Sequence, residues 1–192
     1  DYQSGAVLDR MYSEYSKELL TIPAMPEFQF LRAQKQVYDH LTDQYFSYSG
    51  PTSMGKSFIM RMFLKSQVES GVEKNFALIV PTKALINEVT SKIINDLKEN
   101  LKKYNYRLVT SAGALVLKEQ HNFIFVLTPE RLLYLLISNP DLELHYLFVD
   151  EAHKLSEVDS RGPFYYKVID KLVERKNKPH VIFASPNIPN PE

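Results

Sequence analysis

The sequence predicts an α/β fold, in which a parallel β-sheet is covered by helices on both faces. Strand-like apolar segments alternate with helical ones, and no repeats or low-complexity tracts interrupt this order. Such alternation is typical of parallel sheets whose ligands bind at the carboxyl ends of the strands. A glycine-containing loop at 50–57 and an acidic pair at 150–151 each follow a predicted strand, so both are expected at that edge.

Hydrophobic periodicity and turn residues predict the individual elements. The predicted helices lie near 6–20, 31–42, 56–69, 83–103, 129–138 and 163–176. The predicted strands lie near 45–49, 76–80, 106–110, 123–127, 145–149 and 180–184. Pro23 and Pro26 mark a turn after the first helix, so residues 1–25 are expected to form a helical extension of a single domain, 1–192. The first helix carries its apolar side chains at Val7, Leu8, Met11, Tyr12, Tyr15 and Leu19.

Residues 50–57 read Gly-Pro-Thr-Ser-Met-Gly-Lys-Ser, which is a phosphate-binding loop of the form GxxxxGK[ST]. It lies between a predicted strand and a predicted helix, whose first N–H groups and positive dipole end favour an anion. Lys56 is expected to reach the β- and γ-phosphates, and the Ser57 hydroxyl to bind Mg²⁺. The alternative is a chance match in an ordinary turn. The nucleotide-binding residues expected in the loop are Gly50, Pro51, Thr52, Ser53, Met54, Gly55, Lys56 and Ser57.

The acidic pair follows the apolar run Leu147-Phe148-Val149, as expected of a strand buried on both faces. Asp150 is expected to hold Mg²⁺, mostly through water, because this ion keeps part of its hydration shell. Glu151 is expected to position and polarise the attacking water. The alternative is a helix start at which Asp150 caps and Glu151 favours the dipole.

Five segments together resemble the ordered motifs of superfamily-two helicases. Asp150-Glu151-Ala152-His153 is similar to the DEAH form of motif II, and 50–57 to motif I. Pro-Thr-Lys-Ala-Leu at 81–85 resembles motif Ia, Thr-Pro-Glu-Arg-Leu at 128–132 motif Ib, and 185–192 motif III. The resemblance covers 50–192, is closest to the DExH helicases of the Ski2-like group, and implies a RecA-like P-loop domain that hydrolyses ATP with Mg²⁺.

The resemblance also implies roles for individual residues. Those implied in catalysis are Lys56, Asp150, Glu151 and His153, and those implied in metal binding are Ser57 and Asp150. Those implied in contacts with the backbone of DNA or RNA are Pro81, Thr82, Lys83, Thr128, Pro129 and Arg131. Hydroxyls and positive charges suit phosphates and carry no base code. Both segments also suit helix starts capped by threonine, and the two interpretations are compatible because a helix start is itself a phosphate site.

Two departures from the family pattern limit which properties of the family can be expected of this chain. Motif III commonly reads Ser-Ala-Thr, whereas this chain has Ser185-Pro186-Asn187, so the hydroxyl that links hydrolysis to strand separation is missing. Ser185 and Asn187 are still expected to couple the two processes, but unwinding has weaker support than ATP hydrolysis. Upstream, Gln34 is the expected reader of adenine and Gln36 a second possibility, the alternative being a solvated helix face.

Composition bounds the remaining possibilities. The 192 residues include 23 basic and 23 acidic side chains, and this balance is mild evidence against strong autonomous binding to nucleic acid. The chain has no cysteine, which excludes disulfides and thiolate metal sites. No apolar run has the length of a membrane span, so no membrane partner is expected, and the expected location is the cytoplasm, nucleoid or nucleus.

Superfamily-two enzymes use two RecA-like domains, the second of which supplies arginine fingers. The chain is therefore expected to be the first motor domain of a longer protein and to be poorly active alone. The leading functional hypothesis is an ATP-driven helicase or translocase. A nucleic-acid-dependent ATPase switch without unwinding is the alternative. A small-molecule P-loop kinase is disfavoured, because it needs an acceptor pocket and a lid instead of a DEAH pair.

Overall fold

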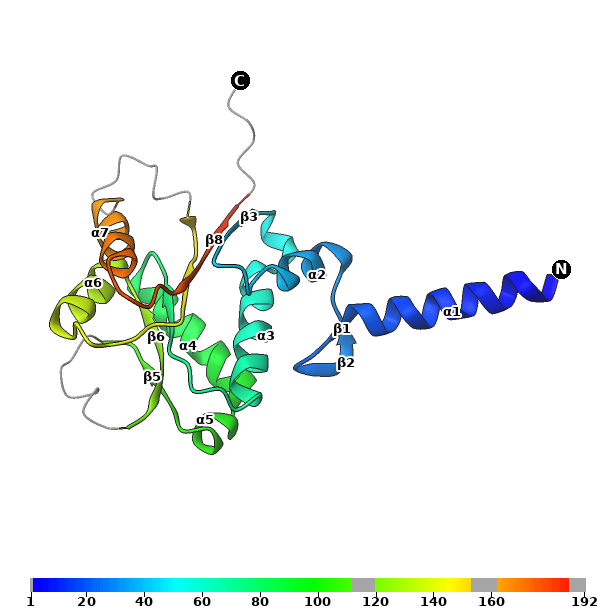
Figure 1. Ribbon diagram of the computed structural model, residues 1–192, viewed down its shortest axis with the longest axis horizontal. Coiled ribbons are helices and arrows are strands. Elements are labelled where there is room, and N and C mark those ends of the chain that lie inside the picture. Colours follow the sequence, from blue (N-terminus) through cyan, green and yellow to red (C-terminus); the bar gives the residue numbers. More distant parts are fainter. Residues whose placement is uncertain (1, 112–119, 153–161, 187–192) are drawn as a thin grey trace, which may run out of the picture.

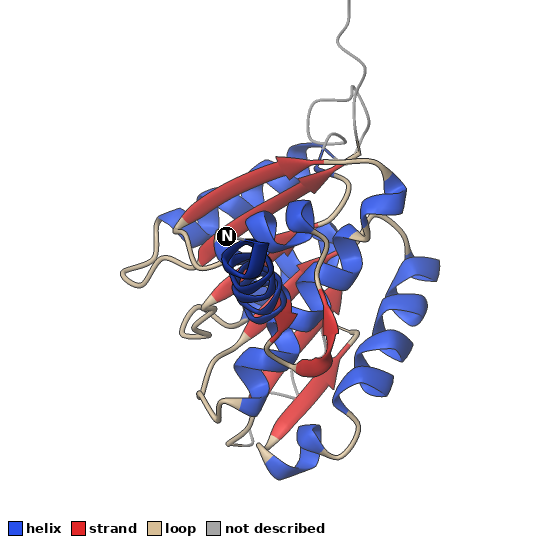
Figure 2. Cartoon of the chain, turned by 90° about the vertical axis from the view of Figure 1, so that its right-hand side faces the viewer, coloured by secondary structure: helices blue, strands red, loops and turns tan. Residues whose placement is uncertain are grey.

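A parallel sheet with helices on both faces forms the body of the molecule (Figures 1 and 2). The computed structural model describes residues 2–111, 120–152 and 162–186. The six strands are β3 (Tyr45–Ser49), β4 (Phe76–Ile79), β5 (Tyr106–Val109), β6 (Asn122–Leu127), β7 (Tyr146–Val149) and β8 (His180–Ser185). Their order across the sheet is β3-β8-β7-β4-β6-β5, and all neighbours pair in parallel. The predicted α/β class is confirmed.

Helices cover the sheet in two layers. One face packs against α2 (Arg32–Asp39), α3 (Lys56–Glu69) and α4 (Lys83–Leu97), and the other against α6 (Pro129–Ser138) and α7 (Gly162–Val173). Consecutive residues of β7 serve opposite layers, because Leu147 packs with the α6–α7 side and Phe148 with the α3–α4 side. All four residues of β7 are buried, as an apolar strand between two helical layers requires.

The segment predicted as one helix over 83–103 is interrupted. Helix α4 ends at Leu97, and a separate short helix, α5 (Asn100–Lys103), follows. Lys98 lies between them with φ of 43°, a left-handed conformation that cannot continue an α-helix. Neither glycine nor proline marks this break, so the sequence pattern did not indicate it.

The N-terminal region differs from the rest of the chain. Helix α1 (Tyr2–Leu20) projects away from the body (Figure 1). After it, β1 (Thr21–Ile22) and β2 (Met25–Gln29) form an antiparallel hairpin where the sequence predicted only a proline-marked turn. Ile22 of the hairpin and Phe30 after it are buried against Met62 of α3, so this hairpin connects α1 to the body.

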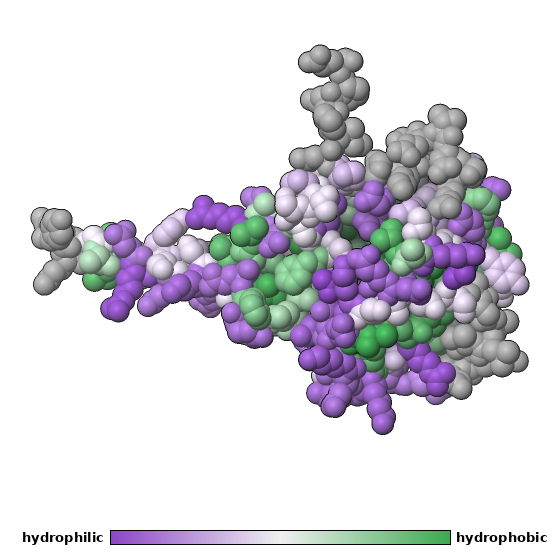
Figure 3. Space-filling model, turned by 180° about the vertical axis from the view of Figure 1, so that it is seen from behind, coloured by the Kyte–Doolittle hydropathy of each residue, from purple (hydrophilic) through white to green (hydrophobic). Residues whose placement is uncertain are grey.

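The apolar side chains of α1 face solvent. Those exposed by 50–65% are Val7, Leu8, Met11, Tyr12, Tyr15 and Leu19. Figure 3 shows apolar surface gathered at the base of α1, where Leu19 and Phe28 of β2 are each about half exposed. Helical periodicity at 6–20 therefore predicted the helix correctly, although its apolar stripe does not contribute to the core.

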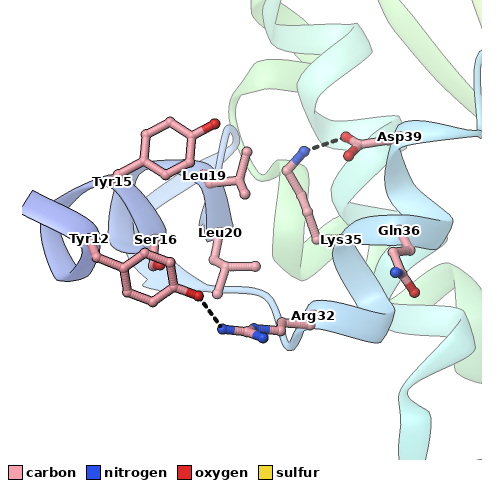
Figure 4. A pocket seen from close by; sticks show the side chains of 9 residues that line it. All are labelled: Tyr12, Tyr15, Ser16, Leu19, Leu20, Arg32, Lys35, Gln36 and Asp39. Carbon is pink, nitrogen blue, oxygen red and sulfur yellow. Dashed lines mark hydrogen bonds and ion pairs between the residues drawn. The ribbon is translucent and has the colours of Figure 1, made fainter. Parts of the chain in front are cut away.

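Polar contacts join α1 to α2 (Figure 4). The Arg32 guanidinium donates a hydrogen bond to the Tyr12 hydroxyl at 3.2 Å, which joins the two helices, whereas Lys35 and Asp39 form an ion pair within α2. These side chains border a cavity of about 330 Å³ between the two helices. Among the described helices, none combines the length and apolar character that crossing a membrane requires.

Candidate nucleotide and nucleic-acid site

The predicted motifs converge on one edge of the sheet. All six strands run in the same direction, and the motifs begin at the carboxyl ends of β3, β4, β6, β7 and β8. Gly50 follows β3, Asp150 follows β7 and Ser185 ends β8. The expectation that separate segments meet at a single edge is confirmed.

The glycine loop is a tight turn that leads into α3. Residues Thr52–Met54 form one 3₁₀ turn, and Gly55 then adopts φ of 72° and ψ of 41°. A Cβ at Gly55 would strain this left-handed backbone and lie 3.3 Å from Nε2 of Gln34. A Cβ at Gly50 would lie 2.4 Å from the sulfur of Met54. The backbone of the loop therefore requires a glycine at Gly55, whereas at Gly50 the close atom belongs to a flexible side chain that can shift.

Lys56 is the first residue of α3 and is buried, with 8% of its surface exposed. Its Nζ donates a hydrogen bond to the Gly50 carbonyl at 2.6 Å, so the side chain crosses the inside of the loop. No carboxylate of the described residues pairs with this ammonium. A buried cation that is bonded to a neutral carbonyl suits an anionic ligand, because its charge is otherwise uncompensated.

Asp150 and Glu151 lie in a turn directly after β7. The Asp150 N–H donates to the Ile79 carbonyl at 3.1 Å, which fixes the start of the turn against β4. The Glu151 N–H donates to Oδ1 of Asp150 at 3.0 Å. The residues that would continue a helix from this turn lie outside the described ones, so the capping alternative stays open. His153 lies outside the described residues.

Glu151 adopts φ of 57°, a left-handed conformation. Such a conformation costs a non-glycine residue roughly 1–2 kcal/mol, and residues of this kind cluster at functional sites.

The loop and the acidic turn meet at a gap of about 10 Å³, which is about the size of one water molecule. Lys56 and Ser57 line it from α3, and Asp150 lines it from the end of β7. Tyr48 of β3 lines it as well, and burial and then the Asp150 carboxylate raise the pKa of its hydroxyl. The cation, the hydroxyl and the carboxylate that the sequence singled out are thus brought together, although Lys56 and Asp150 are far apart in the chain.

Comparison with known proteins agrees with this arrangement. The sequence pattern of the DEAD/DEAH box helicase family matches residues 31–192, which is most of the chain. The chain belongs to the DEAD/DEAH box helicase family. It is also 30% identical over an alignment of 158 residues to a Methanocaldococcus jannaschii protein named an uncharacterized ATP-dependent helicase, and the match covers 73% of this chain. The chain spans only 23% of that relative's length. Membership of the family indicates a helicase-type motor domain that binds ATP.

Gln34 connects this helicase domain's second helix to the glycine loop. Its Oε1 accepts a hydrogen bond from the Leu31 N–H at 2.9 Å, and its Nε2 donates to the Met54 carbonyl at 3.0 Å. Gln36 instead lines the cavity between α1 and α2 (Figure 4). Of the two glutamines, only Gln34 contacts the loop, and its predicted reading of adenine stays a prediction.

Motif III contributes a backbone contact to the loop. Ser185 pairs with Ser49 across the β3–β8 ladder, and its carbonyl accepts a hydrogen bond from the Gly50 N–H at 3.2 Å. The last residue of β8 therefore fixes the first residue of the loop. Asn187, the other predicted coupling residue, lies outside the described residues.

A threonine side chain caps the start of α4, the helix that follows β4. Thr82 is the N-cap of α4, and its Oγ1 accepts a hydrogen bond from the Leu85 N–H at 3.4 Å. Pro81 before it is buried, while Lys83 after it is exposed. The capping predicted for Thr82 is confirmed, and the exposed ammonium of Lys83 remains accessible at the same edge.

The helix start after β6 corrects the prediction for its threonine. Thr128 occupies the N-cap position of α6 with Pro129 at the first helical position, but its side chain makes no capping hydrogen bond. Thr128 is buried, with 7% of its surface exposed. Nη1 of Arg131 donates to the Thr110 carbonyl at 2.8 Å, so this guanidinium also holds the end of β5. No signal in the sequence indicated that contact.

Ser57 and Asp150 are of the residue types that hold Mg²⁺ beside a bound nucleotide. The described residues contain no group of three or more His, Asp or Glu side chains that could hold a metal by themselves. One hydroxyl and one carboxylate, Ser57 and Asp150, line the cavity instead. Mg²⁺ commonly binds in this way, through one or two protein ligands plus phosphates and water.

Proposed function

We propose that this chain is the ATP-binding motor domain of a nucleic-acid helicase or translocase that hydrolyses ATP with Mg²⁺. The observation that carries the proposal is the proximity of Lys56 and Ser57, at the start of α3, to Asp150 at the end of β7, where they border one gap of about 10 Å³. The same parts are needed for phosphoryl transfer, in which catalysis consists mainly of positioning and of charge stabilisation.

In this proposal the loop binds the phosphates and Lys56 moves from the Gly50 carbonyl onto the phosphate oxygens. The exchange replaces a hydrogen bond to a neutral carbonyl with an ion pair, in which donor and acceptor are both charged. Ser57 and Asp150 hold Mg²⁺, which neutralises developing charge on the phosphates. Glu151 accepts a proton from the attacking water, and Gln34 reads the adenine.

Nucleic acid is proposed to bind along the same edge of the sheet. Thr82 and Lys83 offer a hydroxyl and a positive charge at the start of α4, where they suit backbone phosphates of DNA or RNA. A second RecA-like domain of the same protein is proposed to close over the nucleotide and to complete the catalytic site.

A second candidate is an ATPase switch that binds nucleic acid without unwinding it. Two observations favour it: Pro186 replaces the alanine that is common in motif III, and the Arg131 guanidinium already donates to the Thr110 carbonyl. An arginine committed to the fold contributes less to a phosphate contact.

The test uses the full-length protein, with ATP hydrolysis measured with and without single-stranded nucleic acid and strand displacement measured on a partial duplex. Stimulated hydrolysis with displacement supports the helicase, and stimulated hydrolysis alone supports the switch. Absence of Mg²⁺-dependent ATP binding contradicts both candidates.

A further inference from the structure

Tyr48 borders the small gap where Lys56, Ser57 and Asp150 meet, although no sequence motif includes it. It belongs to β3, in which Phe46 and Tyr48 face the α3 layer while Tyr45, Ser47 and Ser49 are exposed. Strand alternation therefore directs the Tyr48 ring under the glycine loop that follows. Its ring stacks on Phe46, with centroids 5.7 Å apart and planes inclined by 21°.

The Tyr48 hydroxyl reaches the small cavity between β7 and the first turn of α3. It donates toward the carbonyl of Lys56 at 3.4 Å, and Ser57 and Asp150 line the same cavity. A phenol has one donor and two acceptor positions. Packing alone would be served by a phenylalanine, since the neighbours Met60, Phe148 and Ile182 are apolar. The hydroxyl is therefore the part of Tyr48 that needs a functional explanation.

We propose that Tyr48 is a positioning residue, whose hydroxyl holds the first turn of α3 over the end of β3 and so sets the distance between the two magnesium ligands, Ser57 and Asp150. This inference rests on the proposed function. The Asp150 carboxylate already affects this hydroxyl, because burial and then that charge raise the pKa of Tyr48. A rigid hydrogen-bonding group at this place reduces the reorganisation needed when the site is loaded.

The test replaces Tyr48 by phenylalanine, which keeps the ring and its contact with Phe46 and removes only the oxygen. Binding of a fluorescent ADP analogue to the full-length protein is titrated once with Mg²⁺ and once with EDTA. The measured quantity is the gain in affinity that Mg²⁺ gives. We expect Y48F to reduce this gain roughly three- to tenfold, the effect of one hydrogen bond. The matched control is Y45F on the exposed face of the same strand, where Tyr45 is 54% exposed.

An unchanged gain in Y48F overturns the inference, even if affinity falls equally with Mg²⁺ and with EDTA, because a uniform loss reports only a disturbed loop. A double-mutant cycle with Asp150→Asn provides a second measurement. Since the hydroxyl is proposed to act through the geometry of Asp150, Y48F should reduce the gain much less in the D150N background. Equal effects in both backgrounds overturn the inference. Wild-type protein that binds no nucleotide in either condition contradicts the proposed function itself.

Discussion

The starts of α3 and α4 have the same strand-to-helix arrangement but differ in how the first turn is capped. Each helix follows a parallel strand, and each begins with a lysine. In α4, Thr82 caps the helix with its own hydroxyl, and Lys83 is exposed. In α3, Gly55 occupies the cap position without a side chain, and Lys56 is buried inside the loop.

The difference shows how one structural unit serves two purposes. A helix start has N–H groups without partners in the helix, which need a side chain, water or a ligand. Thr82 supplies the side chain in α4, so one of the first N–H groups of that helix has a partner within the chain. The glycine at the start of α3 leaves its first N–H groups, and the lysine beside them, for an anion.

The largest expected effect comes from removing the buried lysine. Lys56→Ala should reduce nucleotide affinity at least about tenfold, because a charge-assisted hydrogen bond is lost, and should reduce the ATPase rate of the full-length protein about 10²–10³-fold. Lys83→Ala, at the same position of the neighbouring helix, is the control and should leave nucleotide affinity unchanged. Similar losses in both variants would mean that the two helix starts do not differ in function.

A substitution of Glu151 tests whether the acidic turn acts together with the start of α3 in hydrolysing the nucleotide. Glu151→Gln should keep Mg²⁺-dependent nucleotide binding and reduce the hydrolysis rate about 10²–10⁴-fold, because an amide cannot accept the proton of the attacking water. Binding is measured by fluorescence titration, and hydrolysis by phosphate release. Glu88→Gln, on the exposed surface of α4, is the control. Normal hydrolysis by E151Q would exclude Glu151 as the general base.

The capping threonine should affect stability without affecting the nucleotide site. Thr82→Ala removes the hydrogen bond to the Leu85 N–H and should lower the free energy of unfolding by about 1 kcal/mol. Denaturant unfolding measures this loss, and Thr82→Ser, which keeps a hydroxyl, should largely restore stability. Nucleotide affinity should remain that of the wild type in both variants. A loss of affinity in T82A would show that the two helix starts are coupled.

Much of this fold could be predicted because local patterns and tertiary packing agree. The apolar run before Asp150 is a buried strand, and helix α3 has the predicted bounds, 56–69. The glycine loop was predictable because Gly50 and Gly55 meet steric requirements that act within a few residues. The order of the motifs along the chain then indicated one shared edge of the sheet.

What could not be predicted depends on contacts between distant segments. The hydrogen bond from Arg131 to the Thr110 carbonyl can form only when β5 and β6 are paired, because the two residues follow different strands. Tyr48 reads as an ordinary strand residue until β7 places Asp150 beside it. The hairpin after α1 was missed because Pro23 and Pro26 indicate a turn equally well, and its stability depends on Met62 of α3.

The smallest expected effect concerns the exposed lysine of α4. If Lys83 neutralises one phosphate, Lys83→Ala should flatten the slope of log affinity against log salt by about 0.7–0.9, because one fewer counterion is released. The measurement is fluorescence anisotropy of a single-stranded oligonucleotide with the full-length protein at several salt concentrations. The loss should not depend on sequence, since a phosphate contact reads no base. Lys92→Ala is the control, because Lys92 lies further along α4 and pairs with Glu88. Equal slopes for K83A and the wild type would exclude Lys83 from the interface and leave the start of α4 with only its structural role.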